Sequence, residues 1–391
     1  MPLLQDPLAI LVVLMLNVMV AEWLAKLPYL KHLGTALLVI LVTAIVANIG
    51  LIPASTDTPA IYDGIFVYLA PVSIFYLLLT VHLRQLKKAG KPMVFAFLGG
   101  AVGIMLGMVV GMWLMGGAKA FGALFYALGG MFTATYIGGS SNFNALALHY
   151  EVNKTGNLYA AAIAADNIAT ALWMAVTLLL PSYLQRLFPR VTPETSDSEQ
   201  QQLLNQQADE HINDSENLNP KRLALLIGLG AAGLYVAQIV SQWIPQIPKI
   251  LILTTLALLL AQLGWVQRLR GVRVLAMFCI YLFLAVIGAY CDLAALLADG
   301  RLALDMFFLI VILLGVHALF LFGIGALFKQ DWALLAVASQ ANVGGAASCL
   351  ALSKSFNRPD LHLPGILAGA LGNAVGTYGG LAMAEFLRTW V

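Results

Sequence analysis

Two stretches of 13 residues decide how this chain is organised: YIGGSSNFNALAL, Tyr136–Leu148, and NVGGAASCLALSK, Asn342–Lys354. At an offset of 206 residues they share a Gly-Gly pair and the Ala-Leu pair that follows it. The same offset places Asn167 on Asn373 without a gap. Matching order and spacing predict an internal duplication.

The composition around these stretches is that of a membrane protein. Of the 391 residues, 61% are hydrophobic and 10% are charged, and the mean hydropathy is +0.87. Apolar runs long enough to cross a hydrocarbon core of about 30 Å recur along the chain. The predicted spans are 7–26, 34–52, 61–80, 93–115, 156–180, 222–242, 248–264, 274–296, 302–328 and 361–388. We therefore expect an all-α integral membrane protein that spans a lipid bilayer. The net charge of +2, spread over short loops, does not indicate a nucleic-acid partner.

Two further segments, 120–150 and 331–354, are apolar but interrupted by glycine and polar residues. If both are re-entrant hairpins and the N-terminus is outside, 16 of the 21 basic residues, the loop cation Arg273 among them, lie in the cytoplasm. If both segments span, the division is 11 against 10. Because cytoplasmic loops carry excess Lys and Arg, the sequence predicts inverted repeats of five spans and one hairpin, with both chain termini outside.

The predicted domains follow from this arrangement: a first repeat at 1–180, a polar cytoplasmic linker at 181–221 and a second repeat at 222–391. Within the linker, residues 193–220 hold seven acids, no Lys or Arg and no aromatic residue. Such a composition is typical of a solvated, flexible segment.

The hairpins carry the predicted substrate and ion site. Broken helices leave free N–H groups that attract anions and free carbonyls that attract cations. The candidates at the first break are Gly138, Gly139, Ser140, Ser141, Asn142 and Asn144. Those at the second are Ser339, Gln340, Asn342, Gly344, Gly345 and Ser348.

Asp166 lies near the middle of its predicted span, where a carboxylate costs about 2.5–3.5 kcal/mol. We predict a coupling-ion ligand or a proton carrier; a structural hydrogen bond is the alternative. The supporting candidates are Asn167, Thr170, Asn373 and Thr377, and the predicted sodium ligands are Asp166, Asn167, Ser141 and Asn142. Gly372 is the repeat equivalent of Asp166, so a carboxylate-dependent site should be stronger in the first half.

Other features carry weaker predictions. His317, within a predicted span, is either a proton relay or a neutral histidine bonded to a neighbour. Two glycine ladders predict close helix packing. They are Gly99, Gly103, Gly107 and Gly111 in the fourth span, and Gly372, Gly376 and Gly380 in the last.

The motifs TYIGGSSNF, AAIAADN, ASQANVGGAA and LPGILAGALGNAVGTYGG together resemble the YjcL-like family of uncharacterised polytopic membrane proteins. That family is similar to the superfamily of bile-acid sodium symporters, glutamate symporters, 2-hydroxycarboxylate transporters and cation/proton antiporters. The resemblance implies a scaffold domain and an elevator-type transport domain, with sodium and substrate bound at the two Gly-Gly motifs and Asp166–Asn167.

We therefore expect a secondary active transporter, a sodium-coupled symporter of a small polar or anionic organic solute, acting as a homodimer without a cofactor. Proton coupling or cation/proton exchange is the closest alternative. A sensor or channel is a further one, and so is an intramembrane enzyme, although GxGD, HExxH and GxxxxGK[ST] motifs are absent from the sequence. No Arg or Lys lies deep within a predicted span, so the sequence does not identify the substrate.

Overall fold

The computed structural model describes residues 2–28, 30, 34–54, 59–81, 83–190, 220–291 and 300–390. Throughout these residues the regular structure is helical. Nine helices in this part of the chain are long and apolar enough to cross a membrane. The prediction of an all-α integral membrane protein is therefore confirmed. Of the predicted linker at 181–221, residues 191–219 lie outside the described residues, and its first residues belong to a helix that runs to Leu187.

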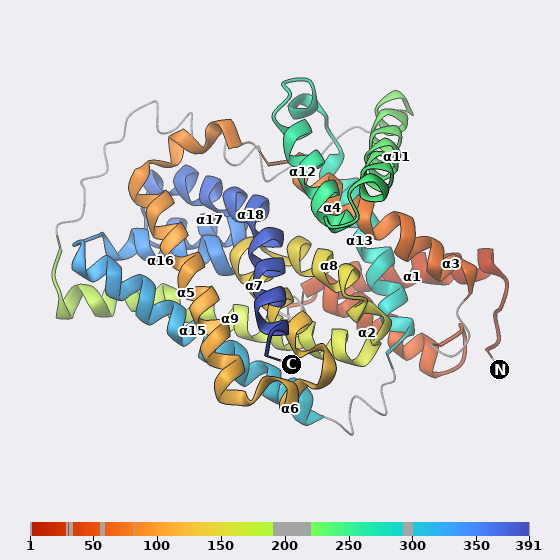
Figure 1. The fold of residues 1–391 in the computed structure, drawn as a ribbon, viewed down its shortest axis with the longest axis horizontal. Coiled ribbons are helices and arrows are strands. Elements are labelled where there is room, and N and C mark those ends of the chain that lie inside the picture. The colour runs from red at the N-terminus through yellow and green to blue at the C-terminus, as the bar shows by residue number, and fades with distance from the viewer. Residues whose placement is uncertain are drawn as a thin grey trace.

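A first helix group gathers the helices that begin each half of the chain, on the right of Figure 1. It contains α1 (Pro7–Leu24), α2 (Gly34–Asn48), α3 (Ala60–Gly64), α4 (Ala70–Leu79), α11 (Pro220–Trp243), α12 (Lys249–Ala261) and α13 (Val272–Ala289). In this group α1 packs on α2, α2 on α13, α13 on α4, α4 on α12 and α12 on α11.

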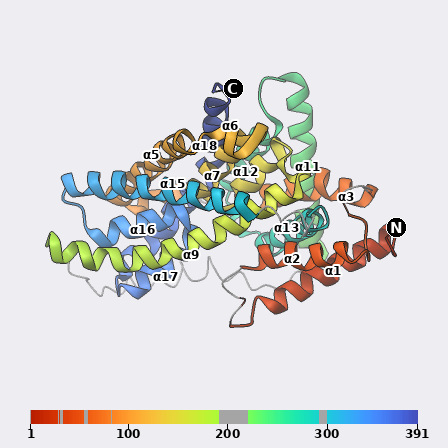
Figure 2. The same cartoon turned by 90° about the horizontal axis from the view of Figure 1, so that it is seen from below.

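A second helix group occupies the left and centre of Figure 1, and Figure 2 shows the same division from below. It contains α5 (Lys91–Met115), α6 (Gly117–Phe121), α7 (Phe125–Gly138), α8 (Ser140–His149), α9 (Gly156–Leu187), α15 (Gly300–Leu327), α16 (Trp332–Val343), α17 (Gly345–Ser355) and α18 (His362–Arg388). The broadest contacts are α7 with α18 and α5 with α15. Short 3₁₀ turns lie at Leu83–Ala89, Gly122–Leu124, Val152–Lys154, Val266–Arg268 and Pro359–Leu361.

Local sequence explains several helix ends and one irregularity. The Asp6 carboxylate caps α1 by accepting from the backbone N–H groups of Leu8 and Ala9, and a proline follows it at the first helical position. Between α3 and α4 the helix widens into a π turn at Ile65–Leu69. Pro71 follows this turn; it offers no N–H and crowds the preceding turn, so the backbone widens instead of breaking.

The first Gly-Gly motif reverses the chain between α7 and α8. Gly139 connects the two helices with φ +84°, a conformation that glycine adopts without strain. Two ring pairs then join the limbs of the resulting hairpin: Phe132 with Phe143, at a centroid distance of 6.0 Å, and Tyr126 with Tyr150, at 5.5 Å. The predicted interruption at 120–150 is thus a helical hairpin with its tip at Gly139.

The second Gly-Gly motif builds a matching hairpin from α16 and α17. Its turn uses Gly345 at φ +69°. Across the limbs, the Cys349 thiol donates to the Val337 carbonyl oxygen at 3.4 Å. At the base, Arg358 Nη1 lies 2.6 Å from Asp331 Oδ2.

The N-terminal half of α18 packs on the second hairpin. A Cβ built on Gly365 would lie 2.6 Å from the Val337 side chain, midway along that hairpin. One built on Gly369 would lie 2.7 Å from the backbone nitrogen of Ala346, at the hairpin tip. Only glycine allows the two backbones to approach so closely.

The C-terminal half of α18 packs on the first hairpin in the reverse order. A Cβ on Gly372 would overlap the carbonyl oxygen of Ile137, beside the hairpin tip. Further along, one on Gly380 would lie 2.7 Å from the carbonyl oxygen of Gly130, toward the hairpin base. The two hairpins therefore reach toward each other from opposite ends of α18, and their tips meet near its middle.

The glycine ladder of α5 packs as predicted in three of its four positions. Cβ atoms on Gly103, Gly107 and Gly111 would each meet α15 atoms at 3.2 Å or less. Gly99 is the exception, because a Cβ there would meet nothing within 4 Å. Its neighbour Gly100 takes part instead, since a Cβ there would lie 2.6 Å from the Asn342 amide nitrogen.

Candidate functional site

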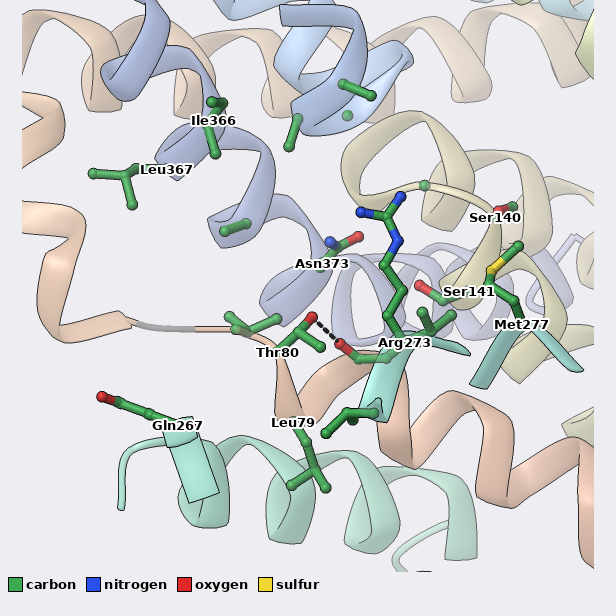
Figure 3. A pocket seen from close by; sticks show the side chains of 18 of the residues that line it. Leu79, Thr80, Ser140, Ser141, Gln267, Arg273, Met277, Ile366, Leu367 and Asn373 are labelled. Atoms are coloured by element: carbon green, nitrogen blue, oxygen red, sulfur yellow. Dashed lines mark hydrogen bonds between the residues drawn. The ribbon is translucent and has the colours of Figure 1, made fainter. Parts of the chain in front are cut away.

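A cavity of about 450 Å³ lies where the tips of both hairpins face the first helix group. The first group contributes residues at the C-terminal end of α4, around Val266–Arg268 and at the start of α13. The second contributes the N-termini of α8 and α17 and one side of α18. Figure 3 shows these elements converging on the same space. Its volume suits a small organic molecule.

Six of the predicted site residues line this cavity: Gly139, Ser140, Ser141, Gly344, Gly345 and Asn373. The backbone brings them together because each Gly-Gly turn starts a new helix at the cavity wall. The first-turn N–H groups of α8 and α17 have no partner within their own helices and carry partial positive charge. Ser141 is 6% exposed, and its hydroxyl has no hydrogen-bond partner among the described residues.

Arg273 also lines the cavity, although its place in the sequence predicted only a cytoplasmic loop cation. It is the second residue of α13. Figure 3 shows its guanidinium extending toward Asn373 and the α8 residues Ser140 and Ser141. No Asp or Glu is among the described residues that line the cavity. The position of Arg273 relative to its predicted span could not show that it lines a cavity, because this depends on how the two helix groups pack together.

Asp166 lies in a separate polar cluster on α9. Its Oδ1 atom is buried and has no hydrogen-bond partner among the described residues. The fully buried Tyr136 hydroxyl of α7 lies near both the Asp166 carboxylate and the Thr170 side chain, one helical turn further along α9. Asn167, next in sequence, is half-buried and interacts with other residues. Tyr136 carried a sequence signal that was missed: it is the repeat equivalent of Asn342.

Asn142 joins the first hairpin to α18 and does not line the cavity. Its Oδ1 accepts from the backbone N–H of Thr377 at 3.1 Å and from its hydroxyl at 2.5 Å. Its amide donates to the Gly138 carbonyl at 2.8 Å. On the same helix, Asn144 accepts a hydrogen bond from the Tyr159 hydroxyl. The four residues predicted to bind sodium therefore do not lie around one point. Ser141 lies at the cavity, Asn142 of α8 is bonded to Thr377 of α18, and Asp166 and Asn167 lie on α9 and do not line the cavity.

The polar side chains of α16 make contacts within the second group. Ser339 Oγ accepts from Trp173 Nε1 at 3.0 Å and lies 2.9 Å from His317 Nε2. His317 Nδ1 lies 2.9 Å from the Gly100 carbonyl oxygen, which can only accept, so Nδ1 carries the proton. Nε2 then accepts from the Ser339 hydroxyl. This arrangement supports the neutral, hydrogen-bonded histidine over a proton relay.

Two other predicted residues of α16 each keep one buried oxygen without a partner in the described chain. Gln340 Nε2 donates to Thr177 Oγ1 at 2.7 Å, whereas its Oε1 is unpaired. Asn342 Nδ2 donates to the Phe97 carbonyl at 3.1 Å, whereas its Oδ1 is unpaired. Ser348 is half-buried and lies beside Gly344 at the hairpin tip.

Comparison with known proteins places the chain in a family. The family described as "protein of unknown function (DUF819)" matches residues 9–390, nearly the whole chain. The "uncharacterized membrane protein YjcL" of Bacillus subtilis (strain 168) is 28% identical over 359 residues, which cover 88% of this chain and 87% of that protein. The chain belongs to the DUF819 family of membrane proteins.

Proposed function

We propose that this chain is a secondary active transporter of a small polar or anionic organic solute, and not an enzyme. In this proposal the second helix group carries the solute and moves as an elevator against the first group, which serves as the scaffold. The chain acts in the bacterial inner membrane as a homodimer, with both of its termini outside and the 181–221 linker in the cytoplasm.

The cavity between the helix groups carries this proposal. Alternating access requires a substrate site at the boundary between two bodies that can move past each other. Here the hairpin tips belong to one group, and the wall that faces them, which includes Arg273, belongs to the other. Sliding of the second group along this wall would carry the tips, and a solute held by them, toward the opposite membrane face.

The helix contacts support inverted repeats as the origin of this arrangement. The hairpins approach α18 from opposite ends, as segments of opposite membrane orientation would. In the two repeats α1 corresponds to α11, α2 to α12 and α4 to α13. Equivalent helices make equivalent contacts: α1 packs on α2 as α11 packs on α12, and α2 packs on α13 as α12 packs on α4. Likewise α7 packs on α18 while α16 packs on α9.

Asp166 is the proposed coupling-ion residue. A buried carboxylate oxygen without a partner, inside a candidate span, is unfavourable unless an ion or a proton occupies it for part of the cycle. The Tyr136 hydroxyl lies near the Asp166 carboxylate and near Thr170, and both hydroxyl groups offer oxygen ligands. They fit a sodium ion better than Asn142 does, because the Asn142 Oδ1 atom already accepts two hydrogen bonds from Thr377.

Proton coupling is the second candidate, and the same contact favours it. A carboxyl group that faces a tyrosine hydroxyl can exchange a proton without any further ligand. A sodium symporter and a proton-coupled transporter differ in which gradient drives uptake against a concentration difference.

Counterflow in proteoliposomes loaded with a mixture of organic acids and amino acids tests the transport proposal. We expect a preloaded substrate to accelerate entry of its labelled form; absence of counterflow for every solute, from protein that is folded, would contradict transport. Uptake driven separately by a sodium or a pH gradient then identifies the ion. Asp166→Asn should abolish gradient-driven accumulation. Asp305→Asn, on α15 and outside the Asp166–Tyr136 cluster, is the control and should not. If Asp166→Asn accumulates solute like the wild type, Asp166 does not couple transport.

A further inference from the structure

We propose that the transported solute is an organic anion, and that Arg273 binds its carboxylate jointly with the N-termini of α8 and α17. The inference rests on the proposed function only in treating the cavity as the cargo site. It assigns a substrate class and gives Arg273 the role of specificity determinant.

The charge of the cavity wall points to an anion. Arg273 is the one ionisable side chain among the described residues that line the cavity. The N-termini of α8, which has 10 residues, and of α17, which has 11, add partial positive charge at the same wall. With no carboxylate lining the cavity among the described residues, the fixed charges of the wall favour an anionic solute over a cationic one.

The hydrogen-bonding groups of the wall are arranged around the guanidinium. The Ser141 side chain is 6% exposed, lines the cavity and lacks a partner among the described residues. Figure 3 shows Ser141 and Asn373 on either side of the Arg273 side chain. A carboxylate between them would receive charge-assisted hydrogen bonds from Arg273 and Ser141, which are stronger than neutral ones.

The apolar residues of the wall limit the size and the polarity of the remainder of the solute. Leu77, Val266, Met277 and Ile366 face the same space. A volume of about 450 Å³ with this lining fits a compact molecule that has one anionic group and an apolar portion. We therefore assign a short carboxylic acid to the cavity.

Arg273 comes from the first helix group, whereas Ser141 and Asn373 come from the second. A carboxylate held by all three joins the groups across their boundary. When the second group moves, the solute leaves Arg273 and keeps only the contacts at the hairpin tips. The side of the membrane on which Arg273 faces the tips should therefore bind the solute more tightly than the other side.

Thermal unfolding of the detergent-purified full chain tests this assignment. The probes are pyruvate, L-lactate, succinate, butyrate and 2-oxoglutarate as sodium salts, each compared with its methyl ester and with sodium chloride at equal ionic strength. We expect at least one carboxylate, but not its ester, to raise the melting temperature. Titration of that carboxylate by calorimetry should show binding about 10- to 100-fold weaker in Arg273→Gln, because a charge-assisted hydrogen bond is lost.

Three further variants make the result specific. Arg268→Gln removes an exposed cation of the preceding 3₁₀ turn, Val266–Arg268, that does not line the cavity, and should bind like the wild type. Arg273→Lys keeps the charge and should lose less affinity than Arg273→Gln. Ser141→Ala should weaken binding several-fold, which keeps the assignment testable if Arg273→Gln does not fold.

Two results would overturn the assignment: no carboxylate protects the wild type, or the carboxylate binds Arg273→Gln and Ser141→Ala as tightly as the wild type. Neither result bears on counterflow of other solutes: if the wild type exchanges a neutral solute but binds no carboxylate, the anion assignment is wrong and the transport proposal stands. Conversely, Arg273-dependent carboxylate binding without counterflow would support the site and contradict transport.

Discussion

Asn142 of the first hairpin is held by Thr377 of α18 through two hydrogen bonds, of 3.1 Å from the backbone N–H and 2.5 Å from the hydroxyl. Both residues are fully buried. The residues are 235 positions apart, so this contact ties the hairpin tip to a helix at the far end of the chain. It fixes the tip beside the cavity and explains a buried asparagine without an ion.

Asn142→Ala should destabilise the protein, because it leaves the buried Thr377 hydroxyl without its acceptor and removes the side-chain acceptor of the Thr377 N–H. We expect a loss of about 1–3 kcal/mol in the free energy of unfolding, measured by thermal and chemical unfolding in detergent. Thr377→Ser, which keeps both donors, should be close to the wild type, whereas Thr377→Val should lose part of the stability. Full stability of Asn142→Ala would show that the contact is dispensable.

Gly372→Ala should loosen the contact between α18 and the first hairpin. The new methyl group would overlap the Ile137 carbonyl oxygen, and forced overpacking of this kind costs about 1–3 kcal/mol. Gly99→Ala provides the matched control in a helix, since a Cβ there meets nothing within 4 Å. We expect the melting temperature to fall for Gly372→Ala and to stay level or rise for Gly99→Ala; equal values would contradict the close crossing.

Sequence predicted the helices well because a backbone in hydrocarbon must satisfy its own hydrogen bonds. The apolar run at 302–328 corresponds to α15 at Gly300–Leu327, and that at 361–388 to α18 at His362–Arg388. Some ends were too long: the predicted span 34–52 ends as α2 at Asn48, before Gly50 turns with φ +81°. The Gly-Gly motifs predicted the breaks because few other residues allow such reversals.

Side-chain partners were harder to predict from the sequence. Whether Asn142 binds an ion or Thr377 depends on which face of α18 meets the hairpin, and no local pattern contains that information. Arg273 was taken for a loop cation because it precedes its predicted span by one residue. Its place at the cavity is set by the packing of α13 against the hairpin tips, which only the assembled fold displays.

Ser339→Ala should remove the hydroxyl between Trp173 and His317. The indole N–H and His317 Nε2 would then both lack a partner in a buried site, at a loss of about 1–3 kcal/mol. Ser355→Ala, in the exposed last turn of α17, is the matched control and should change little. Unfolding in detergent measures the difference; a Ser339→Ala protein as stable as the control would show that the hydroxyl does not bridge the two rings.

The same network predicts the protonation state of His317. Nitrogen-15 NMR of labelled protein, with His317→Gln used for assignment, should show a neutral ring protonated at Nδ1 at neutral pH, because the Gly100 carbonyl accepts from that atom. A ring protonated at both nitrogens, or at Nε2 alone, would contradict this arrangement and restore a proton relay as an explanation of this residue.

Arg358→Gln should destabilise the base of the second hairpin. Arg358 bonds Asp360 at 2.7 Å and Asp331 at 2.6 Å, and these carboxylates, Asp360 foremost, raise its pKa above the ordinary value. Without the guanidinium, two neighbouring carboxylates are left uncompensated, Asp331 among them as the cap of α16, at a loss of about 3 kcal/mol. Arg388→Gln breaks an exposed pair with Glu385 and should have little effect. Comparing the unfolding curves of both variants and the wild type measures this; an Arg358→Gln protein as stable as Arg388→Gln would show that Arg358 does not stabilise the hairpin through these acids.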